Sequence, residues 1–293
     1  MILARLLLFF TVVVWGCTFV ATKILVAYVN PAELLGLRML IGLPILLAVL
    51  LIKKVKLEFT RREKIHLLAG SAVITAHFLI QITGIKYTSA TNTGWLISTS
   101  PLVLAVLSYL FLKERVGRNT ILGIALATVG VVLLMSKGDL GSIGWLESVG
   151  DWLVLVSAFT WAIYTVVTRD VSRSRDPVAV TFFILLPTGI VLIGYLLVKS
   201  DWTRIVHLPL DAVVALAFLG ILGTALAHWF WQVGVSRIGA ARAGIFLYLE
   251  PMATTALAVP YLREPFGIAT AIGGLLVLAG VYWAQRKGSA DAP

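Results

Sequence analysis

The sequence predicts an all-α polytopic membrane protein, with ten transmembrane helices arranged as two inverted-topology five-helix repeats. Its composition, its long apolar segments and an internal duplication each point to this fold. Of the 293 residues 59% are hydrophobic and 13% are charged, and the mean hydropathy is +0.97. Soluble domains are nearer to about 45–50% apolar and about 25% charged. A single soluble core of this size could not bury so much apolar surface, so we expect the chain to lie in a lipid bilayer.

Ten segments contain the roughly 20 predominantly apolar residues that a spanning helix needs. In chain order they are about 6–28, 32–52, 65–85, 89–112, 119–136, 151–168, 177–198, 211–235, 241–262 and 266–284. The first segment is interpreted as a span and not as a signal peptide, because its apolar run is too long. The connectors between the segments are too short to contain a soluble domain.

The lysines and arginines predict the orientation. Seventeen of the 24 fall in connectors on one side of the membrane, five fall in those on the other side, and Lys23 and Arg38 lie within spans. Because cytoplasmic loops are enriched in Lys and Arg, we expect both termini in the cytoplasm and the chain in the cell inner (plasma) membrane. The net charge of +10 does not indicate a nucleic-acid partner, because the bases form short clusters between apolar runs.

The second half of the chain repeats the first at a shift of about 150 residues, which indicates a duplication. The matched pairs include Gly94 and Gly244, Pro101 and Pro251, Glu114 and Glu264, and, with small loop offsets, Trp15 and Trp161, and His77 and His228. We therefore predict repeat 1 at 1–138, a linker at 139–149, repeat 2 at 150–288 and a C-terminal tail at 289–293. Because five spans are an odd number, the second copy enters the membrane from the opposite side. Many secondary transporters have this architecture, with their binding site near the bilayer midplane.

Several residues carry a resemblance to a known family. Trp15 and Lys23 lie in the first span, Pro31 precedes Arg38 in the second, and the fourth contains Pro101 and ends at Glu114. Together with the glycine-spaced fifth span, this pattern resembles the EamA-type repeat, two of which build the drug/metabolite transporter superfamily. The resemblance covers 1–138 and 150–288. It implies a ten-helix secondary carrier of small metabolites, often an exporter of amino acids or related solutes.

Ionisable side chains inside spans are expected to face a cavity, because each costs about 2.5–3.5 kcal/mol at the centre of the bilayer. We predict a substrate site that contains Trp15, Lys23, Arg38, His77, Gln81, Trp161, His228 and Gln232. The two cations can receive a carboxylate, although both can also reach toward the headgroups. Each histidine shares a helix face with a glutamine four residues on, for substrate binding or for hydrogen bonds between helices. A tryptophan offers an apolar wall with one N–H donor. Ile184 stands where the second copy would match Arg38, so a symmetric anion site is not expected.

Glu250 is the only carboxylate predicted deep in the bilayer, directly before Pro251, whose missing N–H can bend the helix. Glu250 is the candidate for a coupling proton, and a neutral or paired structural carboxylate is the alternative; its counterpart in the first copy is Ser100. Glu114 and Glu264 end the fourth and ninth spans. Their matched placement predicts either closure of opposite ends of the cavity or a helix-end role in which each pairs with nearby bases.

The sequence contains no catalytic, nucleotide-binding or metal-binding motif, and its single cysteine excludes an intrachain disulfide. We therefore expect no enzyme activity, no cofactor and no metal. The expected function is secondary transport by alternating access of a small zwitterion or organic anion such as an amino acid, in the export direction. Its partners are this substrate, lipid and, if transport is proton-coupled, protons; facilitated export is the alternative. Two other classes stay open, a polytopic membrane enzyme and a non-transporting partner subunit. The pattern contains no signal for one substrate or one oligomeric state.

Overall fold

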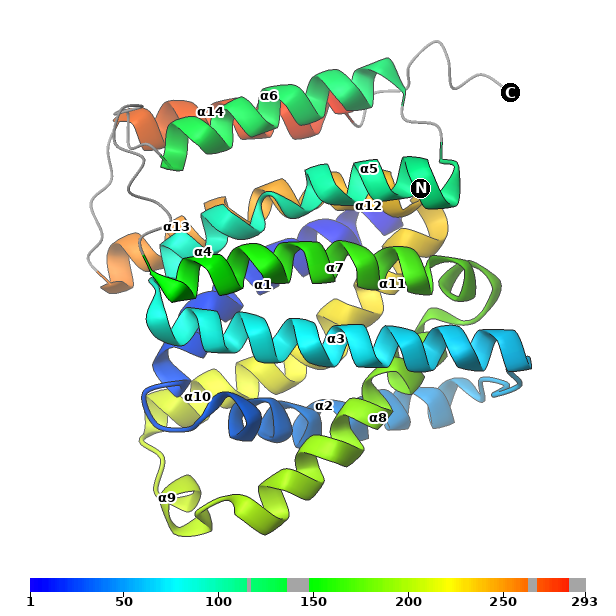
Figure 1. Cartoon of the computed structure of the whole chain (residues 1–293), viewed down its shortest axis with the longest axis vertical. Coiled ribbons are helices and arrows are strands. Elements are labelled where there is room, and N and C mark those ends of the chain that lie inside the picture. The colour runs from blue at the N-terminus through cyan, green and yellow to red at the C-terminus, as the bar shows by residue number, and fades with distance from the viewer. Residues whose placement is uncertain (115–116, 136–147, 263–267, 285–293) are drawn as a thin grey trace.

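The computed structural model describes residues 1–114, 117–135, 148–262 and 268–284, and this part of the chain is a bundle of helices without strands. Figure 1 shows most of the long helices side by side, with α6 and α14 as an outer layer. In the first half the helices are α1 (Ile2–Leu25), α2 (Pro31–Lys53), α3 (Arg61–Tyr87), α4 (Ala90–Ile97), α5 (Ser100–Leu112) and α6 (Arg118–Met135). The second half contains α7 (Val149–Ser174), α8 (Pro177–Lys199), α9 (Trp202–Val206), α10 (Leu210–Phe218), the π-helix η1 (Leu219–Leu226), α11 (Ala227–Ile238), α12 (Ala240–Gly244), the 3-10 helix η2 (Ile245–Leu249), α13 (Glu250–Leu262) and α14 (Ile268–Ala284). The predicted linker 139–149 lies almost wholly outside the described residues.

Eight helical segments of the described chain are long and apolar enough to cross a membrane. Two shorter apolar helices, Arg118–Leu133 and Ala271–Ala284, lie in the fifth and tenth predicted spans. The all-helical, ten-span fold predicted from the sequence is therefore confirmed. A span in this count can consist of several helices: α4 with α5, then α10, η1 and α11, and finally α12, η2 and α13.

The helices begin where the sequence provides caps. Asn30 and Glu33 form a reciprocal capping box at the start of α2, and Thr60 with Glu63 does the same for α3. Ser148 and Asp151 cap α7 in this way. Each box satisfies backbone N–H groups that have no partner within the helix, so these ends are fixed by local sequence.

Three predicted single helices are interrupted, the eighth by the π-helix η1 and the fourth and ninth beside a proline. The fourth span breaks between Ile97 and Ser100, and the ninth changes to a 3-10 helix over Ile245–Leu249. The helix that follows each of these two breaks has a proline as its second residue, Pro101 in α5 and Pro251 in α13. Proline removes one backbone donor and crowds the preceding turn, so a continuous α-helix cannot pass through it without distortion. The duplication has thus placed one such break in each half.

The two halves contact each other as a two-fold relation requires. Helix α6 packs along α14 and α2 along α8, while α3 lies on α7 as α1 lies on α11. Small residues allow the α6–α14 contact: a Cβ built on Gly123 would be 2.4 Å from the Cβ of Ala284, and one on Gly130 would be 2.6 Å from the carbonyl oxygen of Gly273. Glycine at these two positions therefore lets α6 and α14 pack closely.

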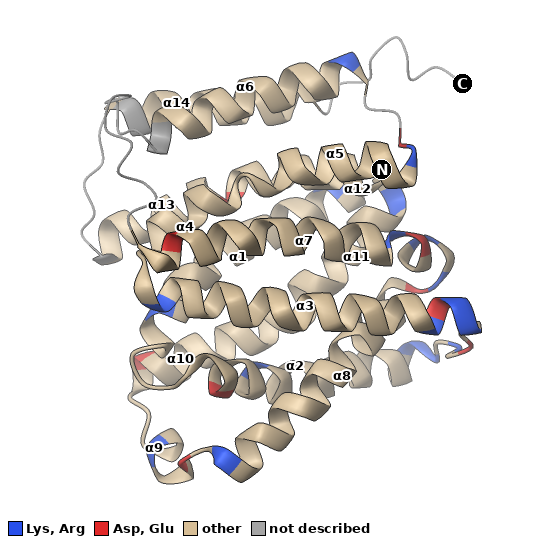
Figure 2. Cartoon of the chain, viewed as in Figure 1, with Lys and Arg blue, Asp and Glu red and all other residues tan. Residues whose placement is uncertain are grey.

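Charged residues gather at the two ends of the bundle and are sparse between them (Figure 2). The basic end is defined here by the starts of α1 and α3 and the ends of α2 and α7, and the distal end is the opposite one. At the basic end Arg175 donates to both carboxylate oxygens of Glu63, at 2.7 and 2.8 Å. These hydrogen bonds raise the pKa of Arg175 above its usual value. Lys53 pairs with Asp176 at 2.9 Å, so α2, α3, α7 and α8 are tied together at this end.

Candidate functional site

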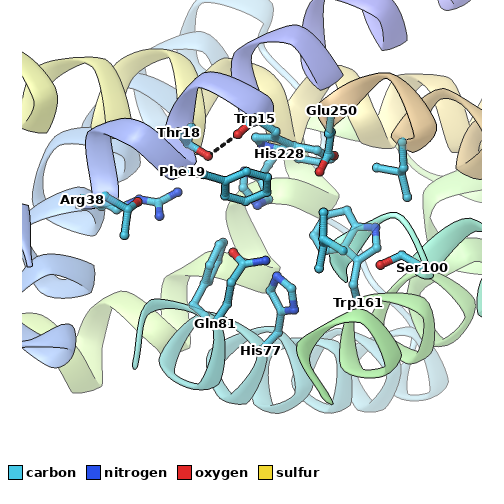
Figure 3. Close-up of a pocket in the computed structure, with 14 residues that line it drawn as sticks. Trp15, Thr18, Phe19, Arg38, His77, Gln81, Ser100, Trp161, His228 and Glu250 are labelled. Atoms are coloured by element: carbon cyan, nitrogen blue, oxygen red, sulfur yellow. Dashed lines mark hydrogen bonds between the residues drawn. The ribbon is translucent and has the colours of Figure 1, made fainter. Parts of the chain in front are cut away.

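A polar cavity lies among α1, α2, α3, α7 and α11, beside the breaks in the fourth and ninth spans (Figure 3). It is lined by Trp15, Thr18, Phe19, Thr22, Arg38, His77, Phe78, Gln81, Ile97, Ser100, Trp161, His228, Leu247 and Glu250. The volume of the cavity is about 40 Å³. That is enough for about three water molecules. The cavity is therefore a narrow site in this conformation.

One face of α1 provides a wall of the cavity. Trp15, Phe19 and Thr22 follow each other at intervals of four and three residues, so they project from the same side of the helix. The backbones of α1 and α13 approach each other closely beside this wall: a Cβ on Gly16 would lie 2.5 Å from the carbonyl oxygen of Glu250. The hydroxyl of Thr254 donates to the carbonyl oxygens of both Gly16 and Glu250, at 2.9 Å each. Glycine at position 16 thus lets α13 present Glu250 beside the α1 wall.

An aromatic layer closes the cavity toward the basic end. The ring centroids of Trp15 and Trp161 are 4.8 Å apart, and Trp231 is 5.4 Å from each. His228 lies edge-to-face against Trp15, at 5.1 Å. The paired tryptophans predicted from the duplication are therefore in direct contact. Beyond them Tyr164 and Trp231 are fully buried, so the way to the basic end is filled with side chains.

The two matched histidines are held in one orientation. Nδ1 of His77 bonds to the carbonyl oxygen of Ser157, and Nδ1 of His228 to that of Gly223, at 2.9 Å in each case. A carbonyl oxygen can only accept, so Nδ1 is assigned the proton in both rings. The π-helix η1 makes the second bond, because its wider turn brings the carbonyl of Gly223 to the residue five positions on. Nε2 of His228 is buried without a partner among the described residues.

Arg38 enters the cavity from α2 and is 4% exposed. Its Nε donates to the hydroxyl of Thr224 at 3.0 Å, and its guanidinium lies 5.0 Å from the ring centroid of Phe78. No carboxylate of the described residues is within 4.0 Å of it. A buried guanidinium of this kind has unused hydrogen-bond donors directed at whatever anion enters the cavity.

Glu250 and Ser100 stand at the two helix breaks, each as the first residue of a new helix. Figure 3 shows Glu250 on the opposite side of the cavity from Arg38. The carboxylate is 3% exposed and has no ion pair or hydrogen-bond partner among the described residues. The hydroxyl of Ser100 and Nε1 of Trp161 are also buried without a partner in this part of the chain.

Seven of the nine residues predicted for substrate or proton binding line the cavity, and Lys23 and Gln232 do not. The ammonium of Lys23 donates to the carbonyl oxygens of Ile85, Lys86 and Thr88, at 2.9, 3.2 and 2.6 Å, where α3 ends. The side chain of Gln232 donates to the hydroxyl of Tyr164 at 2.7 Å and accepts from Ser172. Both residues therefore hold helices together outside the cavity.

Glu114 connects three helices at the basic end. It pairs with Arg169 of α7 at 2.9 Å and accepts from the backbone N–H groups of Ala240 and Ala241, at 3.3 and 3.1 Å. The carboxylate thus joins the end of α5 to α7 and to the start of α12. Glu264, predicted to play the matching role, lies outside the described residues.

Several residues that line the cavity are not among those predicted from the sequence. Thr18, Phe19 and Thr22 continue the helix face that Trp15 begins, so their spacing was an available signal. Phe78 is adjacent to His77, yet it lines the cavity only because it packs under the guanidinium of Arg38. Ile97 and Leu247 face the cavity through the helix breaks, and an apolar residue among many others carries no signal of that kind.

A bundle of apolar helices around a narrow polar cavity defines a multi-pass membrane protein. Comparison with known proteins gives the family: the EamA-like transporter family matches residues 2–136 and 148–285. An uncharacterized transporter of Archaeoglobus fulgidus is 31% identical over 97% of each chain, and the uncharacterized transporter YyaM of Bacillus subtilis is 27% identical over 92% of this chain and 89% of its own. A solved crystal structure shares the fold, with a TM-score of 0.76 and 22% identity over 96% of this chain and 97% of that one.

The chain therefore belongs to the EamA-like transporter family, within the drug/metabolite transporter superfamily. The family and the names of these relatives indicate a transporter and not an enzyme. The predicted relationship is confirmed across the whole chain.

Proposed function

We propose that this chain is a secondary carrier of a small zwitterion, an amino acid or a related organic anion with some apolar character, and that it works by alternating access. The observation that supports this proposal is the cavity itself, which contains a buried guanidinium and a buried carboxyl group, neither with an ion-pair partner among the described residues. Charges inside a bilayer are costly and are retained where they bind a substrate or an ion.

The two charged groups suit the two ends of an α-amino acid. The guanidinium of Arg38 offers a donor fork that matches a carboxylate, and the carboxylate of Glu250 can accept from an ammonium group. Between them Trp15, Phe19 and Trp161 form an apolar wall for the side chain. The unpartnered donors of Trp161 and Ser100, with Nε2 of His228, supply further hydrogen-bond positions.

Transport in this proposal requires a change in shape. The present cavity holds about three water molecules, which is too little for an amino acid. The aromatic layer around Trp15 and the contacts of Glu114 close the basic end, so a substrate leaves or enters there only after α5, α7 and α12 separate. Rocking of the two repeats about a central site is the common way in which inverted-repeat carriers achieve this.

We assign the basic end to the cytoplasmic side of the inner membrane, because cytoplasmic loops are rich in Lys and Arg. Export is the proposed direction, and it rests on the family resemblance. Glu250 is the proposed coupling group, since it is the buried carboxylate of the cavity and has no cation beside it in the described chain.

The proposal is tested with the purified chain in liposomes, given a labelled mixture of the twenty amino acids, with and without a pH gradient. Selective, saturable uptake of a few amino acids supports the carrier; uptake no greater than in empty liposomes, from folded protein, removes amino acids as the substrate class. Glu250→Gln keeps an oxygen that can accept from an ammonium group, so it is expected to retain solute exchange and to lose acceleration by the gradient. Glu33→Gln is the matched control: Glu33 is a buried carboxylate that caps α2 outside the cavity, and Gln can cap as well. Retained acceleration in Glu250→Gln contradicts the proton role.

A further inference from the structure

The π-helix η1 anchors three side chains of the central cavity through two of its own consecutive residues. The carbonyl oxygen of Gly223 accepts from Nε1 of Trp15 at 3.2 Å and from Nδ1 of His228 at 2.9 Å. The hydroxyl of Thr224, the next residue, accepts from Nε of Arg38 at 3.0 Å. Neither Gly223 nor Thr224 is among the residues that line the cavity, so both act on it through the side chains that they hold.

The first half of the chain contains a matching threonine with a different partner. Thr75 in α3 and Thr224 lie the same number of residues after the starts of their spans, at Arg61 and Leu210. Each hydroxyl donates to a carbonyl oxygen of its own helix: that of Thr75 four residues back, at 2.7 Å, and that of Thr224 five residues back, at 2.8 Å, as expected for an α-helix and a π-helix. Each oxygen can then accept another hydrogen bond. That of Thr75 lies 2.6 Å from the hydroxyl of Thr188 in α8, whereas that of Thr224 accepts from a guanidinium.

Two differences between the repeats explain the different partners. Arg38 in α2 is matched by Ile184 in α8, and the same shift matches Gly42 with Thr188. Gly42 has no side chain that competes for the hydroxyl of Thr224, and a Cβ there would lie 2.8 Å from Cγ2 of this threonine. Helix α2 therefore packs tightly on η1, with a guanidinium where the other half has an apolar side chain. The hydrogen-bonded pair of Arg38 and Thr224 thus belongs to one half of the duplication only.

The contact with Thr224 decides which donors of Arg38 a substrate can use. A guanidinium has five N–H donors, one on Nε and two on each terminal nitrogen. Because Nε donates to Thr224, the two terminal nitrogens remain for a ligand in the cavity, toward which the side chain extends from α2 (Figure 3). The ring of Phe78 covers one face of the guanidinium, with its centroid 5.0 Å from Cζ. One edge and one face of the guanidinium are therefore held before a substrate arrives.

We propose that Thr224 is a positioning residue for the substrate carboxylate: it holds Nε of Arg38, so that the carboxylate is bound end-on by the two terminal nitrogens. This inference rests on the proposed function, because it assigns the carboxylate of the transported solute to Arg38. The matching Thr75 faces Thr188 and no arginine, so this arrangement supplies a single carboxylate position.

The test compares Thr224→Val with the matched control Thr75→Val in the purified chain. Each variant removes one hydroxyl between helices, but only Thr224→Val removes the partner of Arg38. Thr224→Val is expected to reduce the preference for an amino acid over its carboxamide about fivefold, as the loss of one hydrogen bond predicts. Thr224→Ser is expected to restore the preference, and Thr75→Val to leave it at the wild-type value. In Arg38→Gln protein, Thr224→Val is expected to have no further effect on it. An unchanged preference in Thr224→Val, or an equal loss in Thr75→Val, overturns the proposal.

A measurement without substrate separates this inference from the proposed function. In protein with ¹⁵N-labelled arginine, the Nε–H signal of Arg38 is identified as the one that disappears in Arg38→Lys. It is expected to be protected from exchange with water in wild type and in Thr75→Val, and to lose this protection in Thr224→Val or, if that variant does not fold, in Thr224→Ala. A wild-type chain that shows the protected signal but binds neither the acid nor the amide refutes the proposed function and the carboxylate role with it. Unchanged protection in the Thr224 variants refutes the positioning itself.

Discussion

Replacing Arg38 by glutamine is the sharpest test of the cavity. The guanidinium is buried, uses its Nε on Thr224 and has no carboxylate partner among the described residues, so a substrate carboxylate is its expected counter-charge. A hydrogen bond to a charged group contributes about 1.5–3 kcal/mol. Each 1.4 kcal/mol is about a factor of ten, so Arg38→Gln is expected to weaken substrate binding by roughly 10- to 150-fold.

The same substitution is expected to leave the melting temperature unchanged or to raise it. A buried charge without a partner is a cost to the folded protein that substrate binding offsets, and a neutral side chain removes that cost. Lys23→Gln is the matched control, because the ammonium of Lys23 is fully occupied by three carbonyl oxygens outside the cavity. It is expected to lower the melting temperature and to leave the selectivity for a carboxylate intact.

The assay compares the affinity for the best-bound amino acid with that for its carboxamide, which lacks the negative charge. Wild-type protein is expected to prefer the acid, whereas Arg38→Gln binds the two about equally. Arg38→Lys keeps the charge but loses the fork, and is expected to lie between them. An equal loss of affinity for the acid and the amide, together with a lower melting temperature, would show that Arg38 stabilises the fold and does not bind the substrate carboxylate.

Three further predictions follow from close contacts of the structure. Gly16→Ala is expected to destabilise the protein by about 1–3 kcal/mol, because the new Cβ meets the backbone of α13 at 2.5 Å; Gly194→Ala, where nothing lies within 4 Å, is the control in the same thermal unfolding assay. Glu114→Gln is expected to increase hydrogen exchange across α12, because the ion pair with Arg169 is lost, and unchanged exchange contradicts a closing role. Trp161→Phe keeps an aromatic ring and removes the unpartnered N–H, so affinity should fall about fivefold, the equivalent of about 1 kcal/mol; a variant that binds as tightly as wild type contradicts substrate contact at that atom.

The sequence by itself was sufficient for the architecture. The thickness of the bilayer sets the length of a span, and capping residues such as Asn30 and Glu33 set where a helix starts, so both can be read from local sequence. The duplication matched Trp15 with Trp161, which the structure brings to 4.8 Å. The cost of charge in lipid is by itself enough to indicate Arg38 and Glu250.

Only the tertiary structure decided which of these groups share a cavity. A side chain in a span can reach a substrate, a neighbouring helix or a backbone carbonyl, and the choice depends on how helices distant in the sequence cross. Lys23 donates to carbonyl oxygens at the end of α3, and Gln232 donates to the hydroxyl of Tyr164. Ser100, in contrast, lines the cavity beside a helix break. Glu114 pairs with Arg169, which is 55 residues away in the sequence. Hydropathy fixes depth in the membrane, but only packing fixes the direction in which a side chain points.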